Sequence, residues 1–286
     1  MTRVLLPTDF SENAYHAIQY AIQLFRGKPA HFYLLHTYTP PVFHAAYIMG
    51  SPGHIGLGDD QKVRATERLK ELKERVVREL ADPQHQFSLR AAFNGLAEEI
   101  AAMAKREKVH LVVMGTQGAT GATEILFGSH TVQAIQKSGC PVIAVPSKYE
   151  MAPLEHILFP TDFEIDYAST PLDLLLDICQ TQGARLTVMH VSSGHPKTEA
   201  QKEHRAALAA RLSQTDHAME ELPDQDLITA INGFQEKYPI QLLAMVRNKH
   251  TFFERLFIEP VIKKLGLHIS IPFMVLPYQV APKSEP

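Results

Sequence analysis

The chain has 286 residues, enough for two domains of ordinary size, each with its own buried core. Apolar residues make up 45% of it and charged residues 21%, which is the composition of a globular protein that folds in water. A formal net charge of -3 excludes the basic surface typical of nucleic-acid binding, and no apolar run reaches the ~18 residues that a membrane span requires.

Only two cysteines occur, Cys140 and Cys179, one in each half and without metal-ligand spacing. They favour a reducing compartment and a role as small buried apolar side chains. The sequence enters an apolar strand at Arg3–Leu6 without a charged lead-in or signal-peptide pattern. Cytoplasmic residence is therefore expected.

In the first half, apolar strand patterns alternate with apolar residues spaced at three and four, the mark of an amphipathic helix. Ser11 is the expected N-cap of the first helix. The expected strands are Val4–Leu6, Phe32–His36, Phe87–Phe93, Val109–Val113 and Val142–Val145. The expected helices are Ala14–Phe25, Val63–Leu80, Leu96–Ala104 and Ser129–Lys137, with a long loop over Thr39–Gly58. This alternation predicts a parallel sheet with helices on both faces.

The second half repeats the first. Pro7-Thr8-Asp9-Phe10 returns as Pro160-Thr161-Asp162-Phe163, a shift of 160 − 7 = 153 residues. The strand-end His36 returns as His190, and Met114 returns as Met245. The sequence thus predicts two copies of one α/β unit, at residues 1–147 and 154–280.

A glycine-bearing connection follows the fourth strand of the first half, with Gly115, Gly118 and Gly128 before Ser129. A strand, a glycine loop and a helix start in this order favour phosphate binding, because backbone N–H groups and the helix dipole face the ligand. Gly115 and Gly118 are expected to allow positive φ and close approach, and Gly128 and Ser129 to present N–H groups. An ordinary flexible connection with a serine N-cap is the alternative.

The second half lacks these glycines. At a shift of 131 residues, their places and that of Ser129 are taken by side chains and a proline, namely Val246, Lys249, Glu259 and Pro260. Pro260 removes an N–H group, and Glu259 would repel a phosphate. The second half is therefore not expected to bind a nucleotide in this way.

Pro7-Thr8-Asp9, His36 and the spacing Gly115-x2-Gly118-x9-Gly128-Ser129 resemble the universal stress proteins. The resemblance covers both halves, and the first half carries the motif of the ATP-binding branch. It implies two tandem Rossmann-like domains of the adenine nucleotide alpha hydrolase-like type. Each would have a five-stranded parallel sheet in the order 3-2-1-4-5, with helices on both faces.

The resemblance implies that the first domain binds ATP, or alternatively AMP or ADP, at the point where the winding of the sheet reverses. Mg²⁺ would arrive with the nucleotide. Asp9 would accept protons from the ribose or adenine, although a turn or helix-start role is its alternative. Thr37 would offer backbone atoms to the adenine. The full set of expected ligand residues is Pro7, Thr8, Asp9, Thr37, Met114, Gly115, Gly118, Gly128, Ser129 and His130.

The resemblance also implies that the strands Val142–Val145 and Phe273–Leu276 pair antiparallel. The second half would then replace the partner subunit of a dimer. A homodimer of the whole chain is a separate expectation. The nucleotide would act as a regulatory signal, with slow hydrolysis at most and a signalling protein as partner. The alternatives are a nucleotide-free interaction protein and an enzyme. No hydrolytic triad or zinc pattern is apparent, and the histidines His36, His44 and His54 are spaced too widely for a compact metal site.

Overall fold

The computed structural model describes residues 1–38, 57–80, 82–116, 128–168, 170–192, 194–223, 225–247 and 270–278. These residues form two compact units, divided inside one strand between Val142 and Ile143. The predicted domain limits of 1–147 and 154–280 stay a prediction.

The described part of the first half has five strands in the order β3-β2-β1-β4-β5, and the boundary between the units falls inside β5. β1 pairs parallel with β2 and with β4, and β2 pairs parallel with β3. The strands are β1 (Thr2–Pro7), β2 (Ala30–Tyr38), β3 (His85–Phe93), β4 (Leu111–Gly115) and β5 (Val142–Val145). The predicted 3-2-1-4-5 order is confirmed, and it makes β1 and β4 neighbours at the reversal of winding.

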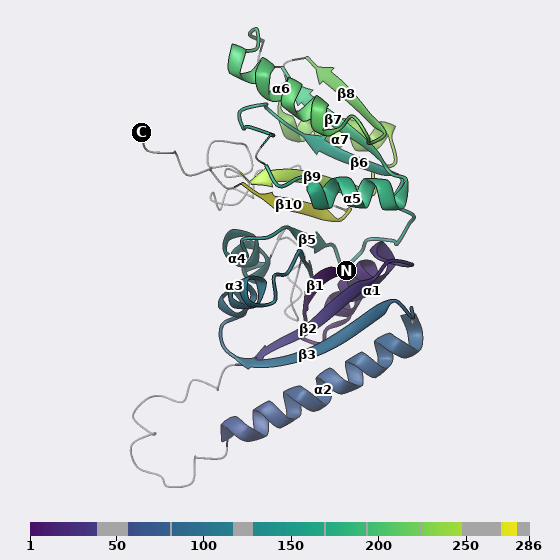
Figure 1. The fold of residues 1–286 in the computed structure, drawn as a ribbon, viewed down its shortest axis with the longest axis vertical. Coiled ribbons are helices and arrows are strands. Elements are labelled where there is room, and N and C mark those ends of the chain that lie inside the picture. The colour runs from purple at the N-terminus through teal and green to yellow at the C-terminus, as the bar shows by residue number, and fades with distance from the viewer. Residues whose placement is uncertain are drawn as a thin grey trace, which may run out of the picture. The chain divides into compact units, whose positions relative to one another are not determined.

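Among the residues described in the first unit, four helices cover this sheet (Figure 1). They are α1 (Glu12–Leu24), α2 (Leu57–Leu80), α3 (Leu96–Arg106) and α4 (Ser129–Lys137). The helices α1 and α2 contact each other and pack on one face, whereas α3 and α4 lie side by side on the other. Residues 39–56 of the expected loop lie outside the described residues. Its last two residues, Leu57 and Gly58, were predicted as loop but begin α2.

The second unit repeats this order as β8-β7-β6-β9-β10. Its strands are β6 (His156–Pro160), β7 (Arg185–Val191), β8 (His217–Leu222), β9 (Leu242–Arg247) and β10 (Phe273–Pro277). Its described helices are α5 (Asp173–Gln182), α6 (Glu199–Arg211) and α7 (Leu227–Lys237). In the register, Val4 faces Leu111 in the first unit and Ile157 faces Leu242 in the second. Both pairs keep the shifts of 153 and 131 residues read from the sequence.

Apolar strands form the core of each unit. In the first, Val4, Leu5 and Leu6 of β1 have no exposed surface. Phe32 of β2 is also fully buried, with its ring 5.4 Å from that of Phe87. Among the described residues, no helix is both long enough and apolar enough to cross a lipid bilayer.

Phe32 and Phe93 offer a matched test of this core, because Phe93 at the end of β3 is 62% exposed. We expect Phe32→Ala to lower the free energy of unfolding by about 3–5 kcal/mol, since it removes a ring from a closed interior. Phe93→Ala should change it by about 0.5 kcal/mol or less. Urea denaturation followed by circular dichroism measures both, and equal losses would contradict the assignment of Phe32 to the core.

Both cysteines are free thiols, with Cys179 buried and Cys140 partly exposed. Burial raises the pKa of Cys140 to about 11 and that of Cys179 to about 12. The reactive thiolate is therefore scarce at neutral pH. We expect Ellman's reagent at pH 8 to modify the folded chain far more slowly than the chain in urea. Equal rates in the two states would show that the thiols are accessible.

Candidate functional site

A tight turn joins β1 to α1 in the first unit, and its own side chains hold it together. The hydroxyl of Thr8 accepts the N–H of Phe10 at 2.9 Å, and Oδ1 of Asp9 accepts the N–H of Ser11 at 3.0 Å. The hydroxyl of Ser11 then accepts the N–H of Ala14 at 3.2 Å, which confirms Ser11 as the N-cap of α1. Asp9 itself is exposed beyond the carboxyl end of β1.

His36 fastens this turn to β2. Its Nδ1 lies 2.8 Å from the carbonyl oxygen of Thr8, and its ring centroid lies 4.5 Å from that of Phe10. Phe10 has a φ of +65°, a left-handed conformation that is uncommon for a residue with a side chain. Hydrogen bonds and ring contacts therefore hold Phe10 in this conformation. Thr37 follows His36 on β2, is half-buried, and pairs with Ala92 of β3.

The second unit builds the same turn. The hydroxyl of Thr161 accepts the N–H of Phe163 at 3.0 Å, and Oδ1 of Asp162 accepts the N–H of Glu164 at 3.0 Å. Phe163 also has positive φ, at +57°, and Nδ1 of His190 lies 2.9 Å from the carbonyl oxygen of Thr161. A turn role for the aspartate thus has direct structural support in both units.

The start of α1 approaches the end of β4 at Gly115. A Cβ atom added at Gly115 would lie 2.5 Å from Nδ2 of Asn13, so this glycine leaves room for the asparagine. The expectation of positive φ at Gly115 is wrong, because Gly115 is not among the residues with positive φ. Close approach explains this glycine, and the approaching group is a side chain of the same chain.

Two hydrogen bonds join β4 to the start of α4. The N–H of Gly128 donates to the carbonyl oxygen of Thr116 at 2.6 Å. The hydroxyl of the buried Thr131 donates to the carbonyl oxygen of Gly115 at 3.0 Å. The N–H of Gly128 thus has a partner within the chain, and the expected contact of Gly128 with a ligand stays a prediction. Its φ of -62° and ψ of 155° make Gly128 the N-cap of α4, and it has no side chain to cap the helix.

The structure brings most of the expected ligand residues to one edge of the sheet. Pro7 ends β1 and is followed by Thr8 and Asp9, and Gly115 ends the neighbouring β4. The remaining described members of the set are Met114, buried in β4, and Ser129 and His130, exposed at the start of α4. Gly118 lies outside the described residues, as do Lys249, Glu259 and Pro260 of the second unit.

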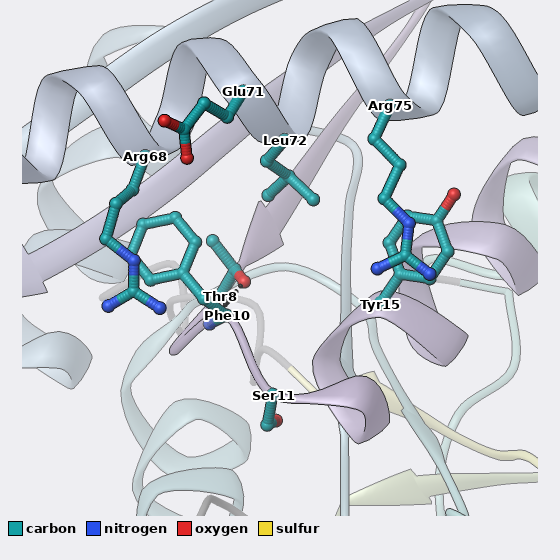
Figure 2. A pocket seen from close by; sticks show the side chains of 8 residues that line it. All are labelled: Thr8, Phe10, Ser11, Tyr15, Arg68, Glu71, Leu72 and Arg75. Carbon is teal, nitrogen blue, oxygen red and sulfur yellow. Dashed lines mark hydrogen bonds between the residues drawn. The ribbon is translucent and has the colours of Figure 1, made fainter.

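A cavity of about 190 Å³ opens beside the turn, between α1 and α2 (Figure 2). Figure 2 shows Arg68 and Arg75 reaching from α2 toward the rings of Phe10 and Tyr15. The guanidinium carbon of Arg68 lies 4.0 Å from the ring centroid of Phe10, and that of Arg75 lies 3.6 Å from the centroid of Tyr15. The lining residues are Thr8, Phe10, Ser11, Tyr15, Arg68, Glu71, Leu72 and Arg75.

Ion pairs and a phenol bond fix one end of this cavity. Arg75 lies 3.2 Å from Glu12 of α1 and 3.3 Å from Glu79 of α2. The hydroxyl of Tyr15 donates to the other carboxylate oxygen of Glu79. Burial, followed by this hydrogen bond, raises the pKa of Tyr15 to about 12, so the phenol keeps its proton. The same bond lowers the pKa of Glu79.

Sequence reasoning missed Asn13, Thr131 and Arg68. Asn13 and Arg68 look like ordinary polar positions on amphipathic helices, and only tertiary contacts give them a place at the site. Thr131 carried no local signal either, because its hydroxyl bonds the carbonyl oxygen of Gly115, 16 residues earlier in the chain. Among the described residues, no group of three or more His, Cys, Asp or Glu side chains could hold a metal ion. His44 and His54 lie outside those residues.

The comparison with protein families gives a match over residues 1–146, to a model described as the universal stress protein family. The chain belongs to the universal stress protein family. The members of this family are stress-response proteins, and the resemblance read from the sequence is confirmed.

Individual universal stress proteins are similar mainly over one half of the chain. The chain is 31% identical over 154 residues to universal stress protein MJ0577 of Methanocaldococcus jannaschii, covering 51% of this chain and 95% of that relative. It is 27% identical over 148 residues to MJ0531 of the same organism, covering 50% and 81%. The crystal structure of a universal stress protein from Archaeoglobus fulgidus covers 96% of both chains with a TM-score of 0.68. At 18% identity, that likeness shows a shared tandem fold.

The contact between Gly115 and Asn13 is testable by a double-mutant cycle. We expect Gly115→Ala to destabilise the chain by about 1–3 kcal/mol, because the new methyl group meets the Asn13 amide. In an Asn13→Ala background the same change should cost at least about 1 kcal/mol less. Urea denaturation of the four chains measures the coupling, and additive effects would contradict the close approach.

Proposed function

We propose that this universal stress protein binds ATP at the carboxyl edge of its first unit, between β1 and β4, and that it does so in the cytoplasm. AMP and ADP are the alternative ligands. The observation that carries the proposal is the convergence of an exposed carboxylate and an exposed helix start at the reversal of winding. Asp9 follows β1, and Ser129 begins α4 behind the β4 connection.

The chemistry of this edge fits a nucleotide. Oδ1 of Asp9 is engaged by the N–H of Ser11, which orients the carboxylate in a position to accept a ribose or adenine proton. At the other side, α4 begins at Ser129 with a glycine N-cap, so its first-turn N–H groups and the Ser129 hydroxyl offer donors to a phosphate. A Mg²⁺ ion would be held by the phosphates and water.

The phosphate contacts are assigned to Ser129 and His130 and not to the N–H of Gly128, which Thr116 occupies. Gly115 contributes by letting Asn13 approach and so setting the distance between α1 and β4. The nucleotide would act as a regulatory signal to a partner protein. The predicted antiparallel pairing of the two halves and the homodimer stay predictions.

A nucleotide-free interaction protein is the second candidate. The observation that favours it is the complete Thr161–Glu164 turn in the second unit, where the aspartate has a folding role and the glycines are absent. An aspartate in this turn is thus retained without a phosphate-binding loop. A slow ATPase is a third candidate, which phosphate release on incubation with MgATP would reveal.

Asp9 and Asp162 provide a matched pair of variants for calorimetry with MgATP. We expect one nucleotide per chain, and an affinity weakened about tenfold in Asp9→Ala through loss of one charge-assisted hydrogen bond. Asp162→Ala removes the equivalent turn bond in the second unit and should leave the affinity unchanged.

Three results would contradict this proposal. Absence of heat from the wild-type chain would favour the nucleotide-free protein. Equal affinities in Asp9→Ala and Asp162→Ala would remove Asp9 from the site. Two nucleotides per chain would show that the second unit also binds.

A further inference from the structure

The cavity between α1 and α2 shares only Thr8 with the residues assigned to the nucleotide, and the proposed function makes no use of it. It is a pocket open to solvent, with a volume of about 190 Å³. This volume is comparable to the ~150 Å³ of an engineered apolar cavity that admits benzene, so a compact molecule fits in it.

The walls of this cavity combine apolar surface with an uncompensated cation. Figure 2 shows Leu72 between the two arginines on α2, pointing toward Thr8. Arg75 is neutralised by Glu12 and Glu79. Arg68, in contrast, forms no ion pair among the described side chains, and its guanidinium lies on the Phe10 ring. A guanidinium stacked in this way keeps its N–H edge available for a carboxylate.

The second unit has a different residue at the position that corresponds to Arg68. At a shift of 204 − 68 = 136 residues, α6 matches α2: Leu208 takes the place of Leu72, and both are buried. His204 takes the place of Arg68, and its Nδ1 lies 2.8 Å from the carbonyl oxygen of Phe163. Phe163 is only 2% exposed, whereas Phe10 is partly open. The second unit thus closes this position with a direct hydrogen bond.

Glu71 affects how strongly the cavity can bind an anion. It lines the same cavity one helical turn after Arg68, and the equivalent residue of the second unit, 136 positions later, is Ala207. Its carboxylate is exposed, so it weakens binding of an anion without preventing it. Binding of an anion should therefore respond in opposite directions to loss of Arg68 and loss of Glu71.

We propose that this cavity binds a small monocarboxylate with a compact apolar body. The carboxylate lies on the guanidinium edge of Arg68, and the apolar body packs against Phe10 and Leu72. The site is separate from the nucleotide site but shares the Thr8–Ser11 turn with it. It belongs to the first unit alone, because His204 occupies the equivalent position in the second.

Benzoate and benzamide, which have nearly the same shape, test the charge requirement on the full-length chain. We expect calorimetry to give one saturable benzoate site per chain and at least about tenfold weaker binding of the uncharged benzamide. Inorganic phosphate should not compete at equal concentration, because it lacks an apolar body. Equal binding of benzamide, full competition by phosphate, or no saturable benzoate binding would overturn the proposal.

Variants of α2 test the residues. Arg68→Gln should weaken benzoate binding about tenfold, whereas Glu71→Gln should tighten it about two- to fivefold. Arg64→Gln is the control, because it removes an exposed arginine of the same helix that does not line the cavity. Circular dichroism confirms that each variant is folded. Equal losses in Arg68→Gln and Arg64→Gln, or weaker binding in Glu71→Gln, would assign the effect to general charge and reject the site.

Discussion

The turn after β1 is the constraint on which the candidate sites depend. His36 bonds the carbonyl oxygen of Thr8, and the Thr8 hydroxyl bonds the N–H of Phe10 in its left-handed conformation. Together these bonds turn the chain sharply enough for Ser11 to cap α1. They leave Asp9 exposed at the sheet edge and direct the Phe10 ring toward α2. The edge proposed to bind the nucleotide and the α1–α2 cavity lie on two sides of this turn.

The same turn determines where α1 can lie. Because α1 starts at Glu12, Asn13 falls in its first turn and reaches Gly115 at the end of β4. Thr131 then bonds the carbonyl oxygen of Gly115 and ties α4 to the same strand end. Hydrogen bonds and one close contact thus connect β1, β4 and the starts of two helices. An edge held in this way needs little reorganisation to receive a ligand, which lowers the cost of binding.

Much of the fold could be predicted from sequence, because its signals are local. The Ser11 cap and the helix Ser129–Lys137 are predicted at the observed residues. The strand order follows from the family resemblance, and the duplication extends it to the second half. The roles of the glycines could not be predicted equally well. Whether Gly115 serves φ, a ligand or a neighbour depends on Asn13, about a hundred residues away. The contact of Arg68 with Phe10 likewise depends on how α2 packs against the turn, which the local sequence does not indicate.

The doubled turn has a consequence for interpreting related sequences. Pro7–Phe10 and Pro160–Phe163 share four residue types and the same hydrogen bonds, although their surroundings differ. A search for this tetrapeptide would find both halves. It would identify the turn that they share and would not indicate whether either half binds a ligand. The two halves are distinguished by positions far from the tetrapeptide in the sequence. Gly115 corresponds to Val246, and Arg68 corresponds to His204. In a duplicated chain, one half can therefore serve as the reference for the other. Positions at which the two halves differ in residue type and contacts are those whose role differs between the halves.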